Sequence, residues 1–284
     1  MGAVPSFAGL TLDQPRLMGV VNVTPDSFSD GGDFLDPTEA IEHGLQMSAD
    51  GADILDIGGE STRPGSAPIS IDEELARVIP VIEGLTRQGK LVSIDTRHAE
   101  VMRQAIAAGA RIVNDVTALT HDPDSIDVCG GAEVDVVIMH MQGEPQTMQD
   151  NPTYDDASAD IMAYLRERVG VMEDAGIARH KITVDPGIGF GKNLDHNLRV
   201  LSRLGDYEDL GLPVLLGASR KSFISKIDRD VPPKDRVAGS LAAAIAGYVR
   251  GVRLFRVHDV LETRQALAVW QAIDQVIDQA IDDA

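Results

Sequence analysis

Side chains that can ionise or form hydrogen bonds follow eight short apolar segments of this 284-residue chain, each near the carboxyl end of its segment. They are Asn22, Asp56, Asp95, Asn114, His140, Asp185, Lys221, Arg256 and His258. Carboxylates and amides can accept from and donate to a bound ligand, and cations can hold an anion. One such residue alone could simply cap a turn or a helix. A polar residue after every segment indicates one shared site.

The cationic residues come from two segments late in the chain. In "RVHD", Arg256 and His258 are two positions apart, so their side chains lie on the same face of an extended strand. Arg253 is one position out of phase and is expected to point outward. The segment "SRKSF" adds Lys221 and Ser222. Two neighbouring cations at a strand end predict an anion site.

Two glycine-containing loops near the N-terminus could cover such a site. "TPDSFSDGG" is long and carries Phe28; it reads either as a solvated turn or as a mobile lid that excludes water when it closes. "GESTRPG" places Thr62 and Arg63 beside Pro64. An arginine in that setting is suited to a phosphate or a carboxylate.

The segment "DPGIGFGK", residues 185–192, looks at first like a phosphate cradle. The spacing G-x-x-x-x-G-K-[ST] of a phosphate-binding loop is absent, however, and the aspartate at its head would repel phosphate. The segment therefore predicts a loop whose acidic residue, Asp185, serves another ligand chemistry.

Metal and nucleophile motifs are mostly missing. The sequence contains no HExxH, CxxC or GxSxG motif, which argues against structural zinc and against a serine nucleophile. Cys129 in "DVCGGAE" has no nearby base and is expected to pack at a helix end. Mg²⁺ held by Asn22 or Asp30 together with substrate phosphates stays open. Met139 could belong to the core or pack on a flat ring.

The elements that position these residues alternate along the chain. Near-continuous Val, Ile and Leu content predicts strands buried on both faces of a parallel sheet. These predicted strands cover 16–24, 53–59, 90–96, 111–116, 135–140, 181–187, 213–218 and 253–259. Helical patterns fill the gaps, including 37–51 with a C-terminal Gly51, a small-residue helix at 236–251 that is expected to be largely buried, and 260–282.

Eight strands alternating with helices predict an α/β fold, a single-domain (β/α)8 TIM barrel spanning residues 1–284. The carboxyl ends of barrel strands meet at one mouth, which would bring the polar residues together. A doubly wound open sheet is the alternative. Its dinucleotide-binding form needs G-x-G-x-x-G after the first strand, where this chain has "NVTPDSFSDGG".

Composition bounds the partners. A formal charge of -20 and a pI near 4.6 argue against nucleic acid, because no basic stripe exists to displace counterions. The acidity is spread along the chain, and we hypothesise a halophilic source. A single cysteine fits a reducing cytoplasm, and no apolar run reaches the length that spans a bilayer, so we expect a cytoplasmic protein with no membrane partner.

Eight segments in order resemble the dihydropteroate synthase family of folate biosynthesis. They are "MGVVNVTPDSFSDGG", "DIGGESTRPG", "SIDT", "IVNDV", "MHMQGEPQTMQ", "DPGIGFGK", "LLGASRKSFI" and "RVHDV". The resemblance covers Leu17 to about Trp270. It implies a TIM barrel, usually dimeric through late helices, that joins 6-hydroxymethyl-7,8-dihydropterin pyrophosphate to p-aminobenzoate in an SN1-like reaction with Mg²⁺.

The resemblance also implies roles for individual residues. The implied pterin site comprises Asp95, Asn114, Met139, Asp185, Gly217 and Lys221. The implied p-aminobenzoate site comprises Phe28, Thr62, Arg63, Pro64, Phe190 and Ser222. The implied pyrophosphate site comprises Asn22, Arg63, Arg256 and His258, with Asn22 and Asp30 near Mg²⁺. Asp95, Asp185, Lys221, Arg256 and His258 are the expected catalytic residues. Asp185 would then accept from NH groups of a neutral heterocycle.

Two alternatives share the pterin pocket. A methyltetrahydrofolate–corrinoid methyltransferase needs no pyrophosphate site, whereas "RVHD" and "ESTRPG" favour one. A pterin-binding barrel without catalysis would not need the cationic cluster. Both therefore fit the sequence less well than the synthase does.

Overall fold

Eight parallel strands form a barrel in the computed structural model, which describes residues 5–24, 37–61, 66–144 and 147–282. They are β3 (Arg16–Asn22), β4 (Ile54–Gly58), β5 (Val92–Asp95), β6 (Ile112–Asp115), β7 (Asp135–Met139), β8 (Ile182–Asp185), β9 (Leu215–Leu216) and β10 (Leu254–Val257). They are ordered β8-β7-β6-β5-β4-β3-β10-β9. A parallel bridge from Val184 to Val214 closes the ring. The predicted TIM barrel is confirmed, and each strand lies inside its predicted segment.

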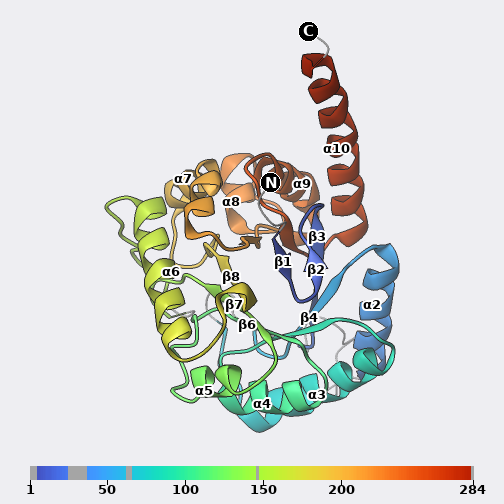
Figure 1. Ribbon diagram of the computed structural model, residues 1–284, viewed down its shortest axis with the longest axis vertical. Helices are drawn as coiled ribbons and strands as arrows, with labels where there is room; N and C mark the ends of the chain where they lie inside the picture. Colours follow the sequence, from blue (N-terminus) through green and yellow to red (C-terminus); the bar gives the residue numbers. More distant parts are fainter. Residues whose placement is uncertain (1–4, 25–36, 62–65, 145–146, 283–284) are drawn as a thin grey trace.

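Helices surround the strands as an outer ring (Figure 1). They are α2 (Pro37–Asp50), α3 (Ile71–Arg87), α4 (Ala99–Ala107), α5 (Ser125–Gly130), α6 (Ala157–Asp174), α7 (Leu194–Ser202), α8 (Ser222–Ile227), α9 (Val237–Val249) and α10 (Val260–Asp282), with short 3₁₀ turns η1 (Arg179–Lys181), η2 (Leu204–Leu210) and η3 (Pro233–Asp235). Local signals set several ends. Ser70 caps α3 by accepting from the Glu73 amide, and Gly51 follows α2 with φ of 112°.

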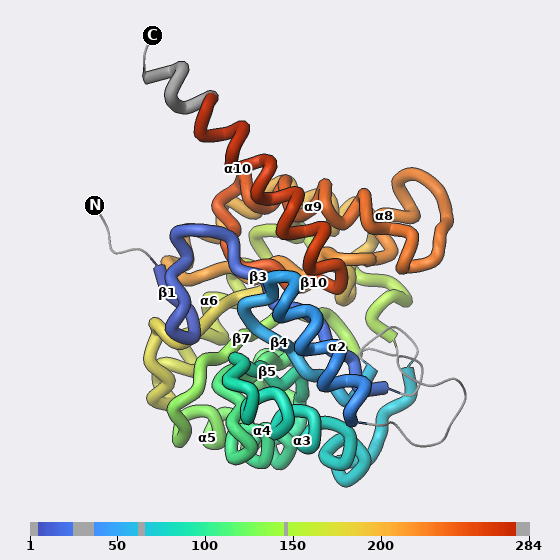
Figure 2. The backbone as a smooth tube through the Cα atoms, turned by 90° about the vertical axis from the view of Figure 1, so that its right-hand side faces the viewer, coloured from blue at the N-terminus to red at the C-terminus, as the bar shows by residue number. Residues whose placement is uncertain are grey.

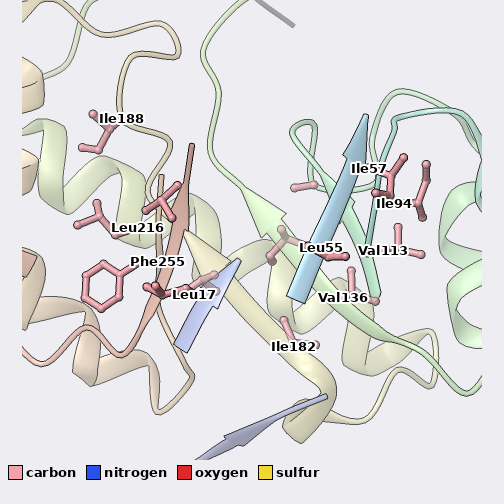
Figure 3. Packing of buried hydrophobic residues seen from close by; sticks show 14 of the residues in the cluster. Leu17, Leu55, Ile57, Ile94, Val113, Val136, Ile182, Ile188, Leu216 and Phe255 are labelled. Atoms are coloured by element: carbon pink, nitrogen blue, oxygen red, sulfur yellow. The ribbon is translucent and has the colours of Figure 1, made fainter. Parts of the chain in front are cut away.

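Alternate strand residues serve two different cores. In β4, Leu55 and Ile57 pack outward against the helices, within the larger apolar cluster (Figure 3). Ile54 belongs instead to a smaller cluster inside the barrel, together with Met18 and Leu254. Because side chains alternate along a strand, Asp56 shares the inward face with Ile54. The strand pattern therefore places a carboxylate inside the barrel, one layer above the apolar cluster.

An N-terminal hairpin closes the end of the barrel opposite the polar residues. It consists of β1 (Ser6–Phe7) and β2 (Leu10–Thr11), paired antiparallel. Phe7 is 1% exposed and packs in the inner apolar cluster. The Ala8 amide donates to Asp135 Oδ1 at 3.2 Å, at the start of β7. This plug was not predicted from the sequence.

Of the two last helices, α10 spans the predicted residues 260–282, whereas α9 differs from expectation. The helix predicted to be largely buried, α9, buries only one face, on which Ser240, Ala243, Ala244 and Gly247 lie, while Val249 is exposed. A Cβ at Gly247 would come within 2.5 Å of Leu216, so glycine permits this close approach. The distal part of α10 extends away from the barrel (Figures 1 and 2). Within the described part of the chain, no helix has both the length and the apolar character of a membrane span.

Candidate active site

The predicted polar residues meet at one end of the barrel because strand register aligns them. Asp95 pairs with Asn114 across β5 and β6, and Met139 pairs with Asp185 across β7 and β8. All four are buried. The mouth predicted from strand ends therefore exists, and its floor is formed by the inward residues of β4 to β8 and β10.

Arg256 occupies the centre of this floor between two carboxylates. Its Nε donates to Asp56 Oδ2 and its Nη2 to Asp95 Oδ2, both at 2.6 Å. Asn114 Nδ2 also donates to Asp56 Oδ2, at 3.1 Å. The other oxygen of Asp56 has no hydrogen-bond partner among the described residues. Arg256 is thus paired with carboxylates in this structure. Asp56, which the sequence placed at the shared site without a specific role, binds both Arg256 and Asn114.

The ionisation of this network follows from its burial. Burial raises the pKa of Asp95 to about 7, with Arg256 opposing the rise and Asp56 adding to it. Burial would lower the pKa of Arg256, but the carboxylates of Asp56 and Asp95 raise it overall, so the guanidinium stays charged. The pKa of Asp95 therefore lies near neutral pH.

Asp185 and Lys221 are the next two charged groups of the mouth, and each influences the pKa of the other. Asp185 is 5% exposed, and its Oδ1 accepts from the Gly187 amide at 2.7 Å. Burial raises the pKa of Asp185, while the Gly187 amide, Lys221 and Arg256 oppose that rise. Burial lowers the pKa of Lys221 to about 8. A Cβ at Gly217 would lie 3.5 Å from Asp185 Oδ2, so the glycine leaves the second carboxylate oxygen accessible.

The loop 187–192 lies against the end of β7. A Cβ at Gly187 would come within 2.0 Å of the His140 carbonyl oxygen, and one at Gly191 within 2.3 Å of the Gln142 carbonyl oxygen. Both glycines also have positive φ, 70° and 59°. The glycines therefore serve close backbone packing, which explains why the segment only superficially resembles a phosphate loop. Lys221 Nζ lies 4.0 Å from the Phe190 ring centroid, a cation–π contact.

His258 is oriented by a serine. Ser219 Oγ accepts from the His258 amide at 3.2 Å and lies 3.1 Å from His258 Nδ1. The hydroxyl of Ser219 can either donate to Nδ1 or accept from it, and the tautomer of the ring decides which. If the Ser219 hydroxyl donates to Nδ1, the proton of a neutral ring is on Nε2. Sequence reasoning gave Ser219 no role, and only its place in "SRKSF" hinted at one.

Other predicted residues have separate outcomes. Phe28, Asp30, Thr62, Arg63 and Pro64 lie outside the described residues. Ser222 begins α8 and is exposed. Arg253 points away from the mouth, as predicted. Its Nη1 donates to the Tyr248 carbonyl at 3.0 Å, and its guanidinium lies over the Tyr248 ring. Cys129 is buried in α5, and burial raises the pKa of its thiol to about 12, so its packing role is confirmed.

The mouth offers a few oxygens to a metal ion. No group of three or more His, Cys, Asp or Glu that could hold a metal is found in the described ranges. A Cβ at Gly58 would lie 3.8 Å from Asn22 Oδ1 and 3.7 Å from Asp95 Oδ2, so both oxygens border the same space. Mg²⁺ commonly takes one or two protein oxygens beside substrate phosphates. Asp95 Oδ2 is already bound by Arg256, and Asp30, the other residue predicted near Mg²⁺, lies outside the described residues, so the Mg²⁺ site stays a prediction.

Comparison with known proteins agrees with this geometry. The profile of a family described as "Pterin binding enzyme" matches residues 18–258. The dihydropteroate synthase of Escherichia coli K12 is 46% identical over 264 residues, 93% of this chain and 93% of that protein. The enzyme of Neisseria meningitidis serogroup B is 45% identical over 268 residues, 92% of this chain and 94% of that protein.

Solved structures give the same result. Xanthomonas albilineans dihydropteroate synthase with 4-aminobenzoic acid has a TM-score of 0.88 and 50% identity, covering 94% of this chain and 96% of that one. The same enzyme in complex with 7,8-dihydropteroate has a TM-score of 0.85 and 47% identity, covering 93% and 95%. The Yersinia pestis enzyme with a sulfonamide drug complex has a TM-score of 0.89 and 43% identity, covering 94% and 96%.

The barrel, its polar mouth and these likenesses define an enzyme that binds a pterin: the chain belongs to the pterin-binding enzyme family. Within that class it belongs to the dihydropteroate synthases, which are transferases. The comparisons thus favour the synthase over the methyltransferase and the non-catalytic binding protein that the sequence left open.

Proposed function

We propose that the mouth of this barrel condenses 6-hydroxymethyl-7,8-dihydropterin pyrophosphate with p-aminobenzoate to give 7,8-dihydropteroate and pyrophosphate. The observation that carries the proposal is the convergence of buried carboxylates, an amide and cations at one barrel end, with Arg256 bound to Asp56 and Asp95 at 2.6 Å. The complexes of the Xanthomonas relative with 4-aminobenzoic acid and with 7,8-dihydropteroate support it.

The pterin ring is assigned to the buried floor. Asp185 would accept from a ring NH and the exocyclic amine, because its Oδ2 faces Gly217, which has no side chain, while Oδ1 is held by the Gly187 amide. Asp95 and Asn114, neighbours in register, would pair with another edge of the ring. Met139 and Gly217 would line the slot, and Lys221 would donate to a ring acceptor.

The pyrophosphate is assigned to Asn22, Arg256 and His258, with Arg63 approaching from its loop. His258 would donate from Nε2, since Ser219 occupies the other ring nitrogen. Arg256 remains charged beside two carboxylates and would stabilise negative charge on the leaving group. Mg²⁺, near Asn22 and Asp30, would supply further charge neutralisation to the phosphates.

The bond changes fit an SN1-like course. The methylene C–O bond breaks, and pyrophosphate leaves with the electron pair. The arylamine nitrogen then forms the C–N bond and loses a proton to solvent. Asp95, when ionised, would favour the positive charge on the pterin methylene electrostatically, so no strong general base is required. Its pKa of about 7 makes that ionisation dependent on pH near neutrality.

The p-aminobenzoate site is assigned to the outer part of the mouth. Phe190, whose ring contacts Lys221, and Ser222, exposed at the start of α8, would contribute from the described residues. Phe28, Thr62, Arg63 and Pro64 would complete it from the two loops. The p-aminobenzoate site is thus proposed to lie nearer the opening of the mouth than the pterin site.

A homodimer in the cytoplasm completes the proposal. Val269, Ile273 and Val276 are exposed on α10 at helical spacing, which suits association with a second copy. The single cysteine is buried and compatible with a reducing compartment. Light scattering during size-exclusion chromatography should give twice the chain mass of 30.4 kDa, and a value of one chain mass would reject the dimer.

Turnover tests the reaction directly. Purified protein given Mg²⁺, the dihydropterin pyrophosphate and p-aminobenzoate should release pyrophosphate and form dihydropteroate in equal amounts. Omission of p-aminobenzoate is the control, because it should abolish product formation. Absence of both products from folded protein, with both substrates present, would reject the proposed reaction.

A further inference from the structure

Lys192, a lysine of the mouth, is buried with no carboxylate partner among the described residues. Lys192 ends the loop 187–192 and is 1% exposed. Among the described residues its Nζ contacts His140 Nδ1 at 3.0 Å, the His140 carbonyl at 3.3 Å and the Phe190 carbonyl at 2.9 Å. Lysine is almost never fully buried unless it is paired, because removing its charge from water is unfavourable. Its position therefore needs a compensating reason.

The surroundings of Nζ match an ammonium group. Three acceptors face it, and an ammonium has three N–H donors. Burial lowers the pKa of His140 to about 3, so its ring is neutral and Nδ1 can accept. Burial also lowers the pKa of Lys192 to about 7, while the Asp185 carboxylate opposes that change. When the ring proton of His140 is on Nε2, Nδ1 accepts, and a neutral amine could then satisfy only two of the three acceptors; in this tautomer the hydrogen bonds favour the charged form.

These bonds join two segments that carry proposed substrate contacts. His140 follows β7 directly after Met139, and Phe190 lies in the loop that begins at Asp185. Neutral contacts hold the same loop from outside: Tyr154 OH donates to the Gly191 carbonyl at 2.7 Å, and the Gly189 amide donates to Asn197 Oδ1 at 2.7 Å. Lys192 adds the charged contact on the inner side.

We propose that Lys192 is a positioning residue of the dihydropterin site. It fixes the loop from Asp185 to Phe190 against β7, and it places a buried positive charge behind the Asp185 carboxylate. Through the Phe190 ring it also supports Lys221, whose Nζ lies 4.0 Å from that ring. This inference rests on the role proposed above for Asp185 as the acceptor of pterin NH groups.

The electrostatic consequence has a definite sign. Lys221, Arg256 and Lys192 are the cations that oppose the rise in the pKa of Asp185 caused by burial. Around Lys192 itself, the titratable side chain in contact is His140, whose ring packs edge-on against Tyr164 and near Tyr154. Loss of the ammonium should raise the pKa of Asp185 further. The carboxylate then becomes protonated at a higher pH and can no longer accept two N–H groups.

The decisive variant is Lys192→Met, whose unbranched side chain is one atom shorter and which removes the charge and the hydrogen bonds. We expect the Kd for dihydropterin pyrophosphate, titrated without p-aminobenzoate, to rise about tenfold or more, with a change below about threefold in the KM for p-aminobenzoate. The acid limb of pterin binding should move to higher pH. A purely structural lysine would lower thermal stability without moving that limb.

Lys181→Met is the matched control. Lys181 precedes β8 at the opposite end of the barrel and pairs with Glu133 at 2.6 Å. Its loss should leave the pterin Kd and the acid limb unchanged. A folded Lys192→Met protein with wild-type Kd and wild-type acid limb would overturn the proposal, as would an equal effect of Lys181→Met.

A second pair of variants applies if Lys192→Met does not fold. His140→Asn places an amide oxygen near the former Nδ1, whereas His140→Ala leaves no acceptor there, and both lose the ring packing. The proposal requires a weaker pterin affinity in the alanine variant than in the asparagine variant; equal affinities would overturn it. The variant Asp185→Asn tests the proposed role of Asp185 separately from that of Lys192. If that variant binds pterin normally, the proposed role of Asp185 fails, whatever Lys192 does.

Discussion

The two ends of this barrel are built from opposite kinds of residue. At the closed end, Phe7 packs with Met18, Ile54 and Leu254, all nearly inaccessible and apolar. At the mouth, the same strands carry Asp56 and Arg256 inside the barrel. From this difference we expect substitutions at the apolar end to change mainly stability. Substitutions at the polar end should change mainly activity. Buried charges lose hydration when a protein folds, and groups with perturbed pKa values cluster at functional sites.

The largest effect is expected from Asp185→Asn. An asparagine keeps an oxygen for the Gly187 amide but cannot accept two N–H groups as a carboxylate does, so kcat/KM should fall about a thousandfold. Stability should not fall. The folded pKa of Asp185 is raised, so its contribution to stability is present at low pH and lost as pH rises through that pKa.

At pH 7 the variant should therefore melt at or above the wild-type temperature. Pyrophosphate release and thermal melting measure the two effects. A variant that loses activity and melts several degrees lower would mean that the mouth also holds the fold together, contrary to the contrast between the ends.

The opposite outcome is expected from Phe7→Ala at the closed end. Removing a fully buried ring should cost about 3 kcal/mol in the free energy of unfolding, because a cavity remains inside the barrel. Activity per folded molecule should stay within about threefold of wild type, since the ring lies at the far end of the strands. Urea unfolding and kinetics below the transition would check this. A large loss of activity in folded protein would contradict it.

The closed end also shows what the sequence could not reveal. Parallel strands buried on both faces give long apolar runs, so all eight were predictable, although β9 proved to be only two residues long. The hairpin was missed because strands of two residues have no periodicity. Its fixed position depends on distant contacts, such as the one from the Ala8 amide to Asp135.

At the mouth, the types of residue were predictable and their pairings were not. Strand ends located Asp95, Asn114 and Asp185, because register follows from the barrel itself. The ion pair between Arg256 and Asp56 joins residues 200 positions apart, and no local pattern encodes it. Lys192 looked like part of a loop motif until its burial among three acceptors was visible.

The pH dependence of kcat distinguishes the roles of Asp95 and Asp56 in the mouth. Ionised Asp95 is proposed to stabilise the pterin cation, and its pKa is about 7, so kcat should decline as pH falls below that value. The charge of Asp56 contributes to raising this pKa. Asp56→Asn should therefore shift the acid limb of kcat to lower pH, and activity at pH 6 relative to its plateau should rise severalfold.

Asp53→Asn is a control for Asp56→Asn. Asp53 accepts from the Leu17 amide at 2.8 Å, near the closed end of the barrel, so the limb should not move. An unchanged limb in Asp56→Asn, or a shift to higher pH, would show that Asp95 is not the group that limits kcat.

The smallest expected effect concerns the surface, which carries most of a net charge of -20. Repulsion between exposed carboxylates is screened by salt, with a Debye length of about 10 Å at 0.1 M and about 3 Å at 1 M. Buried pairs such as Arg256 with Asp56 are screened much less. Melting temperature should therefore rise by a few degrees between 0.1 M and 1 M KCl. The acid limb of kcat, set inside the mouth, should stay in place. A melting temperature that does not change with KCl would reject the halophilic hypothesis, and a limb that moves with salt would place its titrating group on the surface.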